Sequence, residues 1–102
     1  MQLKTFEDLK FKKHHCIEGA ISSYTEFSED FYISVIGGGS GSIKCYGNGK
    51  TSFEIKSTLT DKNGGDSGCV LAWKSKEEVD EHLKQLQLTI LMEMTYKKKY
   101  KQ

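Results

Sequence analysis

The C-terminal quarter of the chain carries the clearest pattern of hydrophobic and polar positions. From Ser75 to Tyr96, apolar residues recur at the three- and four-residue spacing of one helix face: Val79, Leu83, Leu86, Ile90 and Met94. Further apolar residues fall off this stripe, so the half from Leu86 onward is apolar around much of its circumference: Leu88, Leu91 and Met92. The pattern predicts a long helix whose first half docks on a sheet and whose second half needs another covering surface.

Capping residues predict where helices begin. Ser75 and Glu78 match a capping box, in which each side chain binds the backbone N–H of the other, so the long helix is expected to begin at Lys76. Near the other end, Thr5 is suited to cap a short helix from Phe6 to about Lys12, with acidic residues in its first turn.

Between these helices the apolar residues alternate with polar ones, which is typical of strands wetted on one side. We expect five strands: about His15 to Thr25 with a bulge at Gly19, Phe31 to Ile36, Ile43 to Gly47, Thr51 to Leu59, and Cys69 to Trp73. Asn48-Gly49 predicts a type I′ turn between the third and fourth strands, because both residues tolerate positive φ. Asp61 to Gly68 is expected to be a polar loop.

The alternation also predicts which side chains face the core. The inward sets are Phe31, Ile33 and Val35; Thr51, Phe53, Ile55, Ser57 and Leu59; Cys45; and Cys69, Leu71 and Trp73. The connections are too short for crossover helices, so the sheet should be antiparallel. The predicted fold is α+β: one domain over residues 1–102, a meander of about five strands, a short N-terminal helix, a long C-terminal helix packed on one face, and a frayed lysine-rich tail at 97–102. Gly37 to Ser42 fits either a natural hairpin loop or an engineered linker.

The composition of the chain disfavours several classes of binding partner. The 102-residue chain has no apolar run that could span a bilayer and no secretory signal at its start, so we expect a cytoplasmic protein with no membrane partner. All 15 basic residues are lysine, which leaves no guanidinium for bidentate binding of phosphate or guanine. A net charge of +1 also argues against a general polyanion binder. The closing cluster, Lys97, Lys98, Lys99 and Lys101, complements the helix dipole or contacts nucleic acid.

No motif indicates a cofactor. His14, His15, Cys16, Cys45, Cys69 and His82 are metal-ligating types, but none form the close Cys-x-x-Cys or His-x-x-x-His pairs typical of zinc sites, so no metal is expected.

The sequence therefore predicts a small non-enzymatic binding or inhibitory protein, of the immunity-protein or phage anti-defence type, whose partner is another protein or a second copy in a homodimer. The predicted interface comprises Leu88, Leu91, Met92 and Tyr96 on the helix with Tyr32 and Tyr46 on the sheet. Two alternatives remain open. One is a single-stranded nucleic-acid binder that uses the same tyrosines and the lysine tail. The other is a small enzyme with a site near His14, His15 and Asp66.

Overall fold

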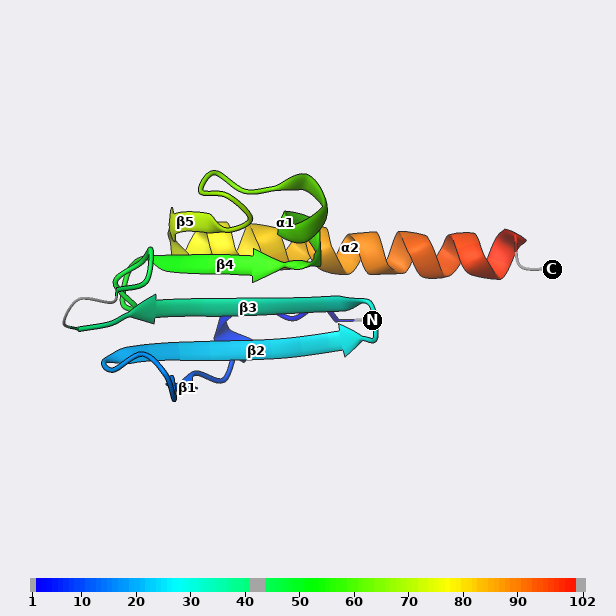
Figure 1. The fold of residues 1–102 in the computed structure, drawn as a ribbon. Coiled ribbons are helices and arrows are strands. Elements are labelled where there is room, and N and C mark those ends of the chain that lie inside the picture. Colours follow the sequence, from blue (N-terminus) through cyan, green and yellow to red (C-terminus); the bar gives the residue numbers. More distant parts are fainter. Residues whose placement is uncertain (1, 41–43, 101–102) are drawn as a thin grey trace.

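A five-stranded antiparallel sheet with one long helix organises the chain (Figure 1). The computed structural model describes residues 2–40 and 44–100. The elements are η1 (Phe6–Asp8), β1 (Lys12–Lys13), β2 (Ala20–Ser28), β3 (Phe31–Gly38), β4 (Phe53–Ser57), α1 (Thr58–Asn63), β5 (Leu71–Lys74) and α2 (Lys76–Tyr100). Strands follow one another in the order β1-β2-β3-β4-β5, so the predicted α+β meander is confirmed.

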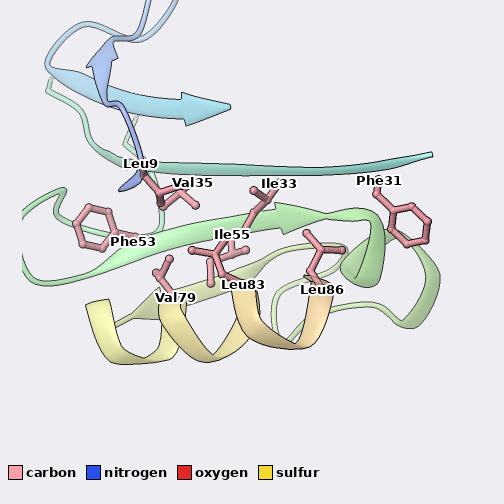
Figure 2. Close-up of a cluster of buried hydrophobic side chains, with 9 residues drawn as sticks. All are labelled: Leu9, Phe31, Ile33, Val35, Phe53, Ile55, Val79, Leu83 and Leu86. Carbon is pink, nitrogen blue, oxygen red and sulfur yellow. The ribbon is translucent and has the colours of Figure 1, made fainter. Parts of the chain in front are cut away.

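The core lies between β3, β4 and the first half of α2 (Figure 2). Alternate residues of the two strands are buried as predicted: Phe31, Ile33, Val35, Phe53, Ile55 and Ser57. The helix contributes its stripe of Val79, Leu83 and Leu86, all of which are fully buried. The predicted capping box is present, with the Ser75 N–H donating to Glu78 Oε1 and the Glu78 N–H donating to Ser75 Oγ.

The N-terminal segment covers the core beside α2. The short helix predicted from Phe6 to about Lys12 is present but ends at Asp8. Only one 3-10 turn forms at Phe6–Asp8, because Leu9 adopts an extended conformation and enters the core. Phe6 and Phe11 then pack their rings on Phe53. Burying these side chains outweighs the local preference for helix.

Two side chains of α2 fasten this N-terminal segment. The Gln87 amide accepts from the Lys4 N–H and donates to the Lys4 carbonyl, each at 2.8 Å. Asp80 Oδ1 accepts from the Phe6 N–H. These contacts join residues more than seventy positions apart.

The first predicted strand begins too early. His14 Nδ1 accepts from the Cys16 and Ile17 N–H groups, which closes a turn between β1 and β2. β2 therefore runs over Ala20–Ser28 instead of His15 to Thr25. Gly19, the expected bulge, adopts φ +80° in that turn, whereas the register shift lies between Glu26 and Ser28.

The strand predicted at Ile43 to Gly47 does not form over residues 44–47; residue 43 lies outside the described part of the chain. Cys45 and Gly47 instead bond to Gly38 at the end of β3. Asn48 Oδ1 then accepts from the N–H groups of Lys50, Thr51 and Ser52, so the expected two-residue hairpin is replaced by a longer loop built on one side chain. Cys45 is buried, as predicted.

Other errors concern the ends of β4 and β5. β4 begins at Phe53, so Thr51, predicted to face the core, lies outside the strand and is exposed. The alternation stops at Ser57, whose hydroxyl caps α1, so Leu59 lies in a helix and Asp61 to Asn63 are not loop. β5 begins at Leu71, so Cys69 precedes the strand and is exposed. Leu71 packs against the core, while Trp73 has φ 56° with 61% of its surface exposed. The positive φ of Trp73 breaks the alternation that would have pointed the indole inward.

Candidate functional site

The second half of α2 extends beyond the sheet. Figure 1 shows the helix continuing past the β2–β3 turn, and the molecule measures 54 × 27 × 23 Å. The helix face that docks on the sheet, which we call the docking stripe, comprises Val79, Leu83, Leu86, Ile90 and Met94. Its burial decreases along the helix: Leu86 is fully buried, Ile90 is partly buried and Met94 is 58% exposed. The predicted stripe is therefore correct for its first half, while its last member is a surface residue.

A second set of apolar side chains lies on the other side of this helix. We call Leu88, Met92 and Tyr96 the outer stripe; they are spaced by four residues and are roughly opposite the docking stripe at about 100° per residue. Leu88 is 36% exposed and Met92 is 72% exposed, and Tyr96 is also exposed. Leu91, between the two stripes, is partly buried. Of the helix residues that the sequence predicted to contact a partner, Met92 and Tyr96 are thus exposed, Leu88 is less so, and Leu91 is partly covered by the chain's own fold.

Neighbouring threonines make this surface less polar than its sequence indicates. The Thr89 hydroxyl donates to the Gln85 carbonyl and the Thr95 hydroxyl donates to the Leu91 carbonyl, each at 2.8 Å. Both hydroxyl hydrogens are thus used within the helix. An apolar partner surface could cover them without leaving a donor unsatisfied.

A cleft of about 390 Å³, which we call the notch, lies where α2 leaves the sheet. It is lined by residues 27–31 of the β2–β3 turn and by Ile90, Glu93 and Met94 of α2. Its apolar members are Phe27, Phe31, Ile90 and Met94, and its acidic members are Glu29, Asp30 and Glu93. The sequence pattern did not predict the notch, because it combines residues about sixty positions apart.

The open face of the sheet carries a polar cluster. The Tyr32 hydroxyl donates to Asp61 Oδ2 at 2.6 Å and accepts from Lys56 Nζ at 2.8 Å, and Lys56 pairs with Asp61 at 2.6 Å. Tyr24 stacks on Tyr32 with ring centroids 5.8 Å apart. The hydrogen bond that Lys56 donates to Asp61 raises the pKa of Lys56 and lowers the pKa of Asp61. Burial is the main cause of the raised pKa of Tyr32.

The fold does not bring Tyr32 and Tyr46 together. Residues on either side of Tyr46 bond to Gly38 at the far end of β3, and Gly38 is six positions along the strand from Tyr32, roughly 20 Å. Tyr46 instead accepts a hydrogen bond from the N–H of Trp73, and both rings are exposed there. The two tyrosines therefore do not form one continuous platform for bases.

Most of the predicted lysine cluster belongs to the end of α2. Lys97, Lys98 and Lys99 lie in the last turn of the helix, which ends at Tyr100, while Lys101 lies outside the described residues. The helix thus places a basic segment beyond the notch and the outer stripe.

The alternative catalytic residues are not assembled. His14, His15 and Cys16 have ligand atoms within 4.8 Å of one another, but His14 Nδ1 accepts from two backbone N–H groups, so Nε2 carries the ring proton and offers no lone pair to a metal. Asp66 binds Lys74 of β5 at 2.8 Å. Since β1 and β5 are opposite edges of the sheet, roughly 20 Å apart, Asp66 cannot act with the histidines.

The structure does contain a serine–histidine pair that the sequence reasoning missed. Ser57 Oγ lies 2.7 Å from His82 Nε2. Ser57 is fully buried, and its oxygen accepts from the Leu59 and Thr60 N–H groups, so its hydrogen donates to His82. A buried hydroxyl that caps a helix cannot reach a substrate, so the pair links α1 to α2 instead. Ser57 and Thr60 form a capping box around the start of α1, and this signal was present in the sequence.

Comparison of the chain with protein-family models, with curated proteins and with solved structures yields no match. Among the described residues, no helix combines the length and the apolar character needed to cross a bilayer.

Proposed function

We propose that this chain is a small non-enzymatic binding protein that acts by covering a surface of a partner protein with the outer stripe. The observation that carries the proposal is that Leu88 and Met92 are exposed on the side of α2 facing away from the core, on a helix that extends beyond its own sheet. An inhibitory role of the immunity-protein or anti-defence kind is the form of this function that we favour.

The outer stripe suits a partner with an apolar groove. Anchors at four-residue intervals on an amphipathic helix are typical of helix-in-groove recognition. Methionine adapts its shape to uneven apolar surfaces, and the tyrosine at position 96 adds an aromatic anchor with a polar tip. The internally bonded hydroxyls of Thr89 and Thr95 lower the cost of removing water from this side of the helix.

A site-specific crosslink tests the proposal. A photoreactive amino acid at position 92, introduced into the chain in cells of its source, should give one defined adduct with a partner protein, to be identified by mass spectrometry. The same group at Asn63, an exposed residue of α1, should not give that adduct. Excess unlabelled wild-type chain should compete, whereas the double variant Leu88→Glu/Met92→Glu should not, because two carboxylates would have to be buried in an apolar groove.

The matched control is Gln2→Glu/Asn63→Glu, which adds the same two charges at exposed positions elsewhere and should compete like the wild type. No adduct, an adduct of the chain only with itself, or equal competition by Leu88→Glu/Met92→Glu would overturn the proposal. Circular dichroism should show both double variants folded. Unfolding of Leu88→Glu/Met92→Glu would instead place those residues in the core.

A further inference from the structure

The notch and the end of α2 have complementary character. The notch offers an apolar floor, mainly Phe27, Phe31 and Ile90, beside the carboxylates of Glu29 and Asp30. Both carboxylates are exposed, and neither forms an ion pair in residues 2–40 and 44–96. An occupant that matches this surface is an apolar helix with a cationic end. The last turns of α2 are such a helix, since Ile90 and Met94 are followed by Lys97, Lys98 and Lys99.

Helical geometry allows the α2 end of each of two copies to fill the notch of the other. In an antiparallel pair centred on Met94, residue 90 of one helix lies opposite residue 98 of the other, because both are four residues, or roughly 6 Å, from the centre. The last turn of each helix then lies over Ile90 of the other, beside the β2–β3 turn that holds Glu29 and Asp30. The two-fold axis repeats this contact, so both notches are filled at once and the assembly closes as a dimer.

We propose that the notch is a homodimer interface: a second copy of this chain lays the end of its α2 antiparallel across the notch, which pairs Met94 of one copy with Met94 of the other and brings Lys97 and Lys98 of each helix toward Glu29 and Asp30 of the other copy. The antiparallel arrangement also sets the two helix dipoles in favourable opposition. The outer stripe lies on the other side of α2 and is not part of this dimer interface. The inference therefore does not rest on the function proposed above.

Charge reversal provides a test that only a self-complementary interface passes. In Glu29→Lys/Asp30→Lys the notch repels the lysine end, and in Lys97→Glu/Lys98→Glu/Lys99→Glu the helix end repels the notch. Each variant alone should self-associate at least roughly tenfold more weakly than the wild type in sedimentation velocity, since like charges face each other twice per dimer. Mixed in equal amounts, the two variants should form a heterodimer, because both of its contacts then join opposite charges.

The controls separate this interface from the outer stripe. Leu88→Glu/Met92→Glu should dimerise like the wild type, and wild-type association should weaken as salt is raised. A wild type that stays monomeric at the highest soluble concentration, reversed variants that associate like the wild type, a mixture that behaves like its separate components, or loss of the dimer only in Leu88→Glu/Met92→Glu would each overturn the proposal. If Asp30→Lys disturbs the turn, Glu29→Lys alone serves in the same scheme.

Discussion

Some contacts between elements depend on a single side chain whose protonation changes with pH. His82 is such a residue, because its Nε2 accepts the Ser57 hydroxyl that also caps α1. Burial lowers the pKa of His82 below its ordinary value of about 6.5. The neutral ring is therefore the form that the folded chain favours.

The folded chain should lose stability in mild acid through this histidine. Below about pH 6.5 the unfolded chain protonates His82 while the folded chain does not, so the free energy of unfolding falls until the pH reaches the lowered pKa, by at most about 1.4 kcal/mol per pH unit. Above about pH 6.5 the contribution is fully present. Urea unfolding at a series of pH values between about 7.5 and 5 measures this slope.

His82→Gln is the matched control, because its amide oxygen can still accept from Ser57 but does not titrate in this range. The variant should lose this part of the pH dependence. Identical slopes for the wild type and the variant would show that His82 is not the group responsible.

At the scale of the element, α2 combines two environments in one continuous helix. Its first half packs against the sheet on one side and the N-terminal segment on another, through Gln87 and Asp80. From Leu88 to Tyr96 the chain covers the helix less completely: Ile90 and Met94 line the notch, and Leu88, Met92 and Tyr96 form the outer stripe. The composition of a helical segment thus does not reveal its burial.

Two truncations in α2 should separate these environments. Leu83→Ala should lower the free energy of unfolding by about 2–5 kcal/mol, because it leaves a cavity in the core. Met92→Ala should change it by less than about 0.5 kcal/mol, because its side chain is 72% exposed. Chemical denaturation of both variants in dilute solution gives the comparison. A cost at Met92 similar to that at Leu83 would mean that the chain buries its helix end after all.

At the scale of the whole molecule, the end of α2 makes the shape elongated. The two proposed interfaces lie on opposite sides of this helix end. The notch would take a second copy, while the outer stripe would take a different protein. Stability should accordingly be uneven along α2, since local opening costs least where few apolar contacts hold a segment.

Amide hydrogen exchange should show this unevenness. In dilute solution, the amides of residues 92–96 should exchange much faster than those from Val79 to Gln87, which belong to the packed half of the helix. At concentrations where the chain dimerises, protection of residues 92–96 should rise. Equally slow exchange along the whole helix in dilute solution would contradict the picture of an unsupported end.

Features that depend on neighbouring residues were predictable from the sequence. The capping box at Ser75 marked the start of α2, and the alternation along β3 and β4 identified the residues that face the core. Predictions failed where a side chain accepts hydrogen bonds from nearby backbone N–H groups and so fixes a turn, as Asn48 does in its loop and His14 does before β2. The exposed Trp73 was also mispredicted, because one residue with positive φ reverses the direction that alternation implies.

Periodicity and capping act over a few residues, so the sequence was sufficient to specify an α+β meander with one long amphipathic helix. The point at which that helix leaves the sheet, the acidic notch between the β2–β3 turn and α2, and the contact of Ser57 with His82 depend on the folded chain. These features join residues 25 or more positions apart, and their distances follow from how the sheet, the turn and the helix pack together. No local pattern records that packing.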